Sequence, residues 1–383
     1  MILESDIAQY FDTRRPDNLK QFSTLEGFLG SQLYSEPDLQ KSVDVQVAII
    51  GIDETRNAYP MPYAAKADNV RYWLYQLAAF SNLKIADFGN LILGNNVADT
   101  YSAVSYLTES LVKSGIIPIY IGGSHDLTLP IVEGLLSVQN QVEIGIMDSS
   151  FDILKSESVN SRSFVGAMAQ KYKSHLTTNI IGYQSYLVSS AQQDYLNDIN
   201  IDGYRIGLLR QNINEMEPVL RDCDMISFDA GCVRQTDMPA SQLLSPNGLY
   251  AEEACQLATF AGLSDKSEVF GTFGLVSKNT PLEVSANLTA QIIWHYIYGV
   301  SQRKNDYPKC NLDGYKKIFV KLNNTEFDLV FYQNLENERF WIEIPDVKGK
   351  EKTIISCSKS DYTQLVNNKI SDRINRILRR HCL

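Results

Sequence analysis

Along the first three hundred residues, short apolar runs rich in β-branched side chains alternate with stretches whose apolar residues recur every three or four positions. Runs of the first kind predict strands, and stretches of the second kind predict amphipathic helices. The expected strands are VDVQVAIIGID (43–53), KIADFGNLI (84–92), IIPIYIGG (116–123), VEIGIMD (142–148), TNIIGYQ (178–184), YRIGLLR (204–210), DMISFDAG (224–231) and EVFGTFGLV (268–276). Helical periods lie between them at 69–80, 100–115, 163–173 and 249–263. This alternation predicts an α/β fold with a mainly parallel sheet of about eight strands, covered by helices on both faces.

The pattern changes from about Tyr307. The segment KKIFVKLNNTEFDLVFYQNLENERFWIEIP (316–345) holds three extended runs separated by polar turn residues, which predicts a small antiparallel β-meander. Its consecutive Phe340, Trp341 and Ile342 would leave part of the run facing outward, because alternate side chains of a strand point to opposite faces. After it, 361–380 predicts one helix whose apolar face carries Leu365, Ile370, Ile374 and Ile377, with arginines solvated at its end.

These patterns divide the chain into three parts. Residues 1–44 are mixed polar and aromatic and predict a short helical arm. Residues 45–304 form the α/β domain, and residues 305–383 form the C-terminal β-meander and helix extension.

Charge and composition narrow the class of protein. The formal net charge is −10 and the sequence pI is about 5.0, which argues against a nucleic-acid partner, because such binding rests on clustered Lys and Arg. The N-terminus lacks a signal-peptide pattern, and no apolar run approaches the roughly 20 residues needed to cross a bilayer. The six cysteines include no Cys-x-x-Cys pair, and we expect them to be reduced thiols. We therefore expect a cytoplasmic protein without membrane insertion.

Chemistry-bearing residues gather at the predicted carboxyl ends of strands. His125 follows a Gly-Gly turn in IGGSHD, Asp148 and Asp152 stand in DSSFD, and Asp229 ends SFD. Ligands bind at this edge of a parallel sheet. One imidazole with three carboxylates suits a divalent cation such as Mn²⁺, which hydrolases use to activate water. The alternative is that each Asp only caps a following helix.

Three segments, GGSHD, DSSFD and SFDAGCVRQTDMP, resemble the signatures of the arginase, agmatinase and formiminoglutamase superfamily of binuclear manganese ureohydrolases. Those signatures are Gly-Gly-Asp-His-Ser, Asp-Ala-His-x-Asp and Ser-x-Asp-x-Asp-x-x-Asp-Pro. The resemblance runs from about Val45 to Gln302 and is strongest to a long bacterial branch labelled formiminoglutamase. It implies a three-layer α/β/α sandwich around an eight-stranded parallel sheet.

The resemblance implies metal ligands at particular positions. His125, Asp148, Asp152 and Asp229 match the four ligands of the first metal, and all four are kept. The second metal shares Asp148 and Asp229. Its two private ligands, a His and an Asp in the family, fall on Ser150 and Gly231 here. A conserved family acid falls on Ser277, and Arg162 stands nearest the position of the proton-shuttle His of arginases.

Three interpretations follow. The first is a catalytically inactive pseudoenzyme that acts as a binding or scaffold protein and meets a protein partner through the N-terminal arm or the C-terminal extension, with homo-oligomers possible. The second is a metal-dependent hydrolase of a linear amidine or guanidino C–N bond, such as a formimidoylglutamase, with Asp152 as its candidate catalytic residue. The third is a sensor whose pocket binds a small guanidino or amide ligand. For the cofactor we expect either none or one divalent metal, Mn²⁺ first.

Overall fold

The computed structural model describes residues 7–14, 16–34, 44–60, 65–196, 201–277, 281–308, 312–321, 328–344 and 353–382. A nine-stranded sheet forms the centre, in the order β1-β3-β2-β4-β9-β8-β5-β6-β7. The strands are β1 (Phe11–Asp12), β2 (Val47–Ile52), β3 (Ile85–Leu91), β4 (Ile117–Gly122), β5 (Val142–Met147), β6 (Leu176–Tyr183), β7 (Ile201–Arg205), β8 (Met225–Asp229) and β9 (Val269–Phe273). Eight of them run parallel, which confirms the predicted sheet, and β1 pairs antiparallel with β3 at one edge.

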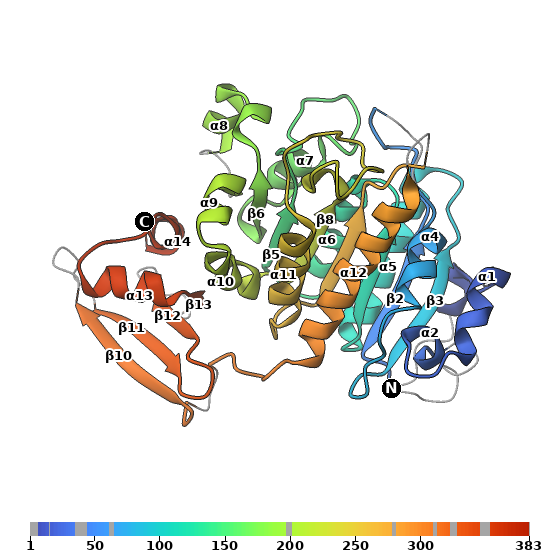
Figure 1. The fold of residues 1–383 in the computed structure, drawn as a ribbon. Helices are drawn as coiled ribbons and strands as arrows, with labels where there is room; N and C mark the ends of the chain where they lie inside the picture. Colours follow the sequence, from blue (N-terminus) through green and yellow to red (C-terminus); the bar gives the residue numbers. More distant parts are fainter. Residues whose placement is uncertain are drawn as a thin grey trace.

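Helices cover both faces of this sheet (Figure 1). One apolar layer packs against α4 (Ala67–Leu74), α10 (Glu217–Asp222), α11 (Ala251–Gly262) and α12 (Leu282–Ser301). The other packs against α5 (Val97–Lys113), α6 (Thr128–Leu136) and α7 (Phe164–Tyr172). The strands are buried on both sides, which explains why they read as continuous apolar runs rather than as alternating patterns. Shorter helices are α1 (Asp17–Lys20), α2 (Leu29–Gln32), α8 (Ser190–Leu196) and α9 (Ile206–Gln211).

A second sheet follows α12 and has four antiparallel strands in the order β10-β11-β12-β13. Its strands are β10 (Tyr315–Lys321), β11 (Asp328–Asn334), β12 (Phe340–Ile344) and β13 (Thr353–Cys357), and they lead into α13 (Lys359–Val366) and α14 (Asp372–Cys382). We call β10 to α14 the C-terminal unit. In Figure 1 it lies at one end of the molecule, beside α10.

The structure corrects four sequence predictions. YRIGLLR is mostly helix, because β7 ends at Arg205 and α9 begins at Ile206. The meander has a fourth strand, β13. The expected single helix is two, since Asn368 adopts φ +57° between α13 and α14, and Ile370 at this break is 45% exposed. The run Phe340–Ile342 does not face outward: all three side chains are buried, because both faces of β12 are covered.

The C-terminal unit is joined to the main domain by polar contacts that are buried or partly buried. The carboxylate of Asp222 in α10 accepts the backbone N–H of Ser356 at 3.0 and 3.1 Å and pairs with Arg373 at 3.1 Å. Arg376 pairs with Asp202 of β7 at 3.1 Å, and Arg380 also contacts that carboxylate. We expected the arginines of the last helix to be solvated, but three of them form ion pairs: Arg376 and Arg380 fix α14 to β7, and Arg373 fixes it to α10.

No helix in the described part of the chain is long and apolar enough to cross a membrane. Cys223, Cys232, Cys255 and Cys357 are buried free thiols.

Candidate metal centre

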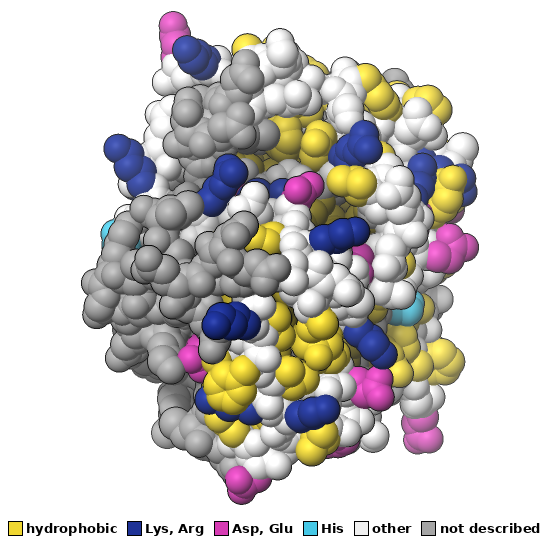
Figure 2. Space-filling model, turned by 90° about the vertical axis from the view of Figure 1, so that its left-hand side faces the viewer, with side chains coloured by type: hydrophobic (Ala, Val, Ile, Leu, Met, Phe, Trp, Pro, Cys, Tyr) yellow, Lys and Arg dark blue, Asp and Glu magenta, His cyan; other side chains and the backbone are white. Residues whose placement is uncertain are grey.

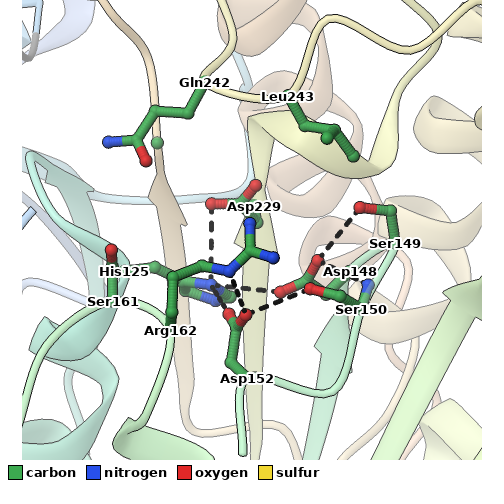
Figure 3. A pocket seen from close by; sticks show the side chains of 11 residues that line it. His125, Asp148, Ser149, Ser150, Asp152, Ser161, Arg162, Asp229, Gln242 and Leu243 are labelled. Atoms are coloured by element: carbon green, nitrogen blue, oxygen red, sulfur yellow. Dashed lines mark hydrogen bonds and ion pairs between the residues drawn. The ribbon is translucent and has the colours of Figure 1, made fainter. Parts of the chain in front are cut away.

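The four predicted first-metal ligands converge at the carboxyl edge of the main sheet (Figure 3). His125 lies just after β4, Asp148 just after β5, and Asp229 at the end of β8. Nδ1 of His125 is 3.5 Å from Oδ2 of Asp148, 3.6 Å from Oδ2 of Asp152 and 3.5 Å from Oδ2 of Asp229. Strands β5 and β8 are neighbours and only β9 separates β8 from β4 at the centre of the sheet, which explains how residues a hundred positions apart meet.

Local backbone geometry brings the last two carboxylates inward. Strand β5 ends at Met147, so Asp152 lies in the loop beyond it and the alternation of side chains along the strand does not orient it. Asp152 instead adopts φ +46°, in the left-handed region that Asp tolerates better than most residues. Beside Asp229, Gly274 has φ +82°, and a Cβ there would come within 2.3 Å of Oδ2 of Asp229. The site thus depends on one unusual aspartate conformation and one glycine.

His125 is held in a fixed orientation. Its Nε2 lies 2.9 Å from the Oγ of Ser227, which itself contacts Oγ1 of Thr128 at 2.6 Å. The ring packs against Phe164 and Phe273, with centroids 4.7 and 5.7 Å away. Nδ1 is buried and has no hydrogen-bond partner among the described residues, since 3.5 Å is too long for a good hydrogen bond. The imidazole therefore points an unused nitrogen at three carboxylate oxygens.

The electrostatics follow from burying three carboxylates together. Burial lowers the pKa of His125, but the contacts with Asp148 and Asp152 and the charge of Asp229 outweigh it and raise the pKa to about 10. Burial and then the charge of Asp148 raise the pKa of Asp152 to about 8. Burial raises the pKa of Asp229 to about 6, against the opposing effect of His125. Like charges this close require a compensating cation or proton.

One divalent ion fits this donor set. Single ligand atoms of His125, Asp148 and Asp152 all lie within 4.8 Å of one another, and Oδ2 of Asp229 faces the same nitrogen. The unpartnered, buried Nδ1 is the kind of atom that a bound cation would satisfy. The sequence prediction that these four residues come together agrees with this geometry, and their role as ligands stays a prediction.

A second ion does not fit in the same way. The backbone N–H of Ser150 donates to Oδ1 of Asp148 at 3.0 Å, and the N–H of Gly231 donates to Oδ1 of Asp229 at 2.6 Å. The Oγ of Ser150 donates to Oδ1 of Asp152 at 3.0 Å. The Oδ1 atoms of both shared carboxylates are thus engaged by residues 150 and 231. Ser150 offers a hydroxyl group and Gly231 offers no side chain. The resemblance implies an imidazole and a carboxylate at these positions as ligands of a second metal.

The other two replaced positions differ in their relation to the site. The side chain of Arg162 is 39% exposed and lies over the cluster, with Nε 3.4 Å from Oδ1 of Asp152 (Figure 3). It brings a permanent positive charge to the acids. Ser277 is exposed and does not line the cavity.

The space around the cluster is small. The cavity lined by His125, the three aspartates and Arg162 is about 30 Å³. Pockets for small organic ligands are usually ten times larger, about 300–1,000 Å³. Gln242 and Leu243 form its outer wall in Figure 3 and were missed by sequence reasoning, because they lie in an irregular segment after β8. No hydrophobic period marks such a segment.

Comparisons with known proteins agree with this architecture. The sequence profile of the Arginase family matches residues 53–299, so the chain belongs to the arginase family. Agmatinase from Pyrococcus horikoshii is 24% identical over 229 residues, which are 58% of this chain and 77% of that protein. Guanidinobutyrase from Pseudomonas aeruginosa is 25% identical over 97 residues, 24% of this chain and only 30% of that protein.

Solved structures show the same fold at low sequence identity. Formiminoglutamase from Trypanosoma cruzi, solved with Mn²⁺, has a TM-score of 0.63 and 19% identity, with coverage of 68% of this chain and 95% of that one. Formimidoylglutamase from Bacillus subtilis has a TM-score of 0.62 and 15% identity, with coverage of 68% and 89%.

Proposed function

We propose that this chain is a catalytically inactive member of the arginase family that serves as a binding or scaffold protein. One observation carries the proposal: the Oδ1 atoms of Asp148 and Asp229 are bonded to the N–H groups of Ser150 and Gly231, the two positions that lack a second-metal ligand. Two ions lower the pKa of a bridging water and stabilise charge on the attacked group. A chain that can hold at most one of them loses much of this stabilisation.

The cavity supports the same proposal. About 30 Å³ leaves room for an ion and water beside it, whereas a guanidino substrate needs a pocket several times larger. The guanidinium of Arg162 already stands over Asp152, where a cationic substrate group would otherwise meet the acids.

A hydrolase assay tests the proposal. Purified protein is incubated with Mn²⁺ and with arginine, agmatine, guanidinobutyrate or formiminoglutamate, and urea, ammonia and formamide are measured. We expect no release above the background. Turnover of any of these at roughly 1 per second, an ordinary enzyme rate, contradicts inactivity.

The alternative is a hydrolase of a linear amidine or guanidino C–N bond, with formimidoylglutamase as the first candidate. The complete set of His125, Asp148, Asp152 and Asp229 favours it. A bound divalent ion, Mn²⁺ first, would supply an activated water. Asp152 is then the candidate catalytic residue, because its carboxylate lines the cavity beside the other three ligands. The same assay separates the two proposals.

For the scaffold role we propose the C-terminal unit as the surface that meets a protein partner. Figure 2 shows this end of the molecule, where Lys and Arg side chains lie among hydrophobic and acidic ones. Phe319 and Leu335 are each 65% exposed, and Lys316 and Lys317 are exposed beside them on the outer strand β10. A partner with an acidic, partly apolar surface would complement it.

The described part of the N-terminal arm is less suited to this role. Leu19 and Phe22 are buried against Tyr75 of the segment that follows α4, so these two apolar residues of the arm already pack on the main domain. Phe319→Asp should abolish co-purification of a partner, while Ile370→Asp, an exposed apolar control in the same unit, should not. If the Phe319→Asp variant keeps every partner and its assembly state, the proposal that this surface binds a protein partner is wrong.

A further inference from the structure

A second cavity lies where the C-terminal unit meets the main domain. It measures about 290 Å³ and lies between α10, the β11–β12 turn and the start of α13. In Figure 1, α10 stands beside β13, which leads into α13. Its volume is close to the lower limit of about 300 Å³ for small-molecule pockets.

A buried arginine, Arg221, lines this cavity, and two of its nitrogens make no hydrogen bond with a described residue. Arg221 is 5% exposed, and its Nη2 donates to the carbonyl oxygens of Phe340 and Cys357 at 3.2 and 3.3 Å. Its guanidinium lies over the ring of Trp341, 4.4 Å from the centroid. Nε and Nη1 are buried and make no hydrogen bond within the described residues. Leaving charged donors unused inside a protein costs free energy unless a ligand or water satisfies them.

The acid nearest to Arg221 does not satisfy it. Oε1 of Glu217 lies 3.3 Å from Nε of Arg221 and also 3.3 Å from Nε of Arg339, and it makes no aligned hydrogen bond with a described residue. Two guanidinium groups therefore share one carboxylate. Nη1 of Arg221 has no hydrogen-bond acceptor among the described residues.

The start of α13 adds further donors to the same cavity. Ser358 caps this helix, and its Oγ accepts the N–H of Asp361 at 2.9 Å. The N–H groups of Lys359 and Ser360, in the first turn, have no acceptor inside the helix. Lys359 and Ser360 both line the cavity, so the first turn of α13 borders it. Helix N-termini favour carboxylates and other anions.

Acidic and apolar groups complete the lining. Glu215 and Glu338 line the cavity and repel a ligand of high negative charge, while they attract an ammonium group. Pro218, Phe260 and Phe340 supply an apolar wall. We propose that this cavity binds a free amino acid or a similar small zwitterion, with its carboxylate toward Arg221 and the start of α13 and its ammonium toward Glu215 or Glu338.

The test uses the full chain and free amino acids as probes. Each standard L-amino acid, at on the order of 10 mM, is added to the protein, and the melting temperature is measured against acetate, methylammonium chloride and inorganic phosphate at matched ionic strength. We expect at least one amino acid to raise the melting temperature more than any of these ions. Titration calorimetry then gives its Kd.

Variants locate the binding. Lys359→Gln and Arg339→Gln should each weaken the Kd about threefold or more, while Lys316→Gln, an exposed lysine of β10 outside the cavity, should leave it unchanged. The proposal fails if no amino acid exceeds the simple ions, or if acetate or phosphate alone binds as tightly as the best amino acid. It also fails if neither cavity variant changes the Kd relative to Lys316→Gln.

Discussion

The backbone N–H of Gly231 donates a 2.6 Å hydrogen bond to Oδ1 of Asp229, on the side of that carboxylate opposite His125. Oδ2 of the same carboxylate lies 3.5 Å from Nδ1 of His125. The two oxygens therefore belong to two different environments, one shaped for an ion and one closed by backbone. Ser150 and Asp148 repeat this arrangement on the neighbouring strand end.

This arrangement predicts the metal content. The protein should bind zero or one Mn²⁺ per chain, because among the residues that the structure describes only the set around His125 offers enough ligand atoms. If one ion is found, His125→Ala should remove it, while His175→Ala, far along the chain with its Nδ1 near the carbonyl of Asn140, should not. Elemental analysis after dialysis gives the count, and two bound ions in the wild-type protein would contradict our assignment of these strand ends.

Restoring the missing ligands should raise the count. We expect Ser150→His with Gly231→Asp to bring manganese stoichiometry toward two, since Ser150 lines the cavity and residue 231 adjoins Asp229. A Cβ at position 231 would lie 2.6 Å from Oδ1 of Asp229 and 3.3 Å from Cβ of Leu243, so the double variant should also melt at a lower temperature. Adding Leu243→Ala should relieve part of that loss. A count that stays at one or below in both variants, with folded protein by circular dichroism, refutes the prediction.

Trp341 should anchor the C-terminal unit. Its side chain is fully buried beneath the Arg221 guanidinium. Trp341→Ala should lower the free energy of unfolding by about 3–5 kcal/mol, the usual cost of removing a large buried aromatic side chain. Leu335→Ala, an exposed control, should change it by less than about 0.5 kcal/mol. Urea denaturation measures both, and equal effects would show that Trp341 does not anchor the unit.

Stability should depend on pH through Glu143. Burial and the negative charge of Asp222 raise the pKa of this carboxyl from its ordinary value of 4.5 to about 7. Between pH 4.5 and about pH 7, Glu143 therefore keeps its proton in the folded state but has lost it in the unfolded state. The contribution of Glu143 is fully present below about pH 4.5 and is lost as the pH rises to about 7.

Glu143→Gln removes this titration. The free energy of unfolding of the variant should therefore fall less between pH 5 and 7 than that of the wild-type protein. Denaturation curves across this range give the comparison. Identical slopes for the two proteins would mean that Glu143 ionises normally in the folded state.

The parallel sheet could be predicted from sequence because its strands are buried on both faces and read as apolar runs. Seven of the eight predicted runs contain the observed strand or most of it, and YRIGLLR failed because α9 follows β7 without a turn residue. The two-residue β1 carries too little pattern to be seen. The break at Asn367 and Asn368 was missed because the apolar spacing continues across it to Ile374.

Which residue types stand at the strand ends could be read from the sequence: the four residues that match first-metal ligands are present, and Ser150 and Gly231 stand where the resemblance implies two further ligands. The folded chain was needed to show that the Oδ1 atoms of Asp148 and Asp229 accept backbone N–H groups and that Arg162 lies over Asp152. It also shows that Arg221, which lines a cavity, has two nitrogens without a hydrogen bond among the described residues. The reason is physical. Residue identity sets which ligands are possible, whereas hydrogen-bond direction, burial and cavity size arise from segments distant in sequence that pack together.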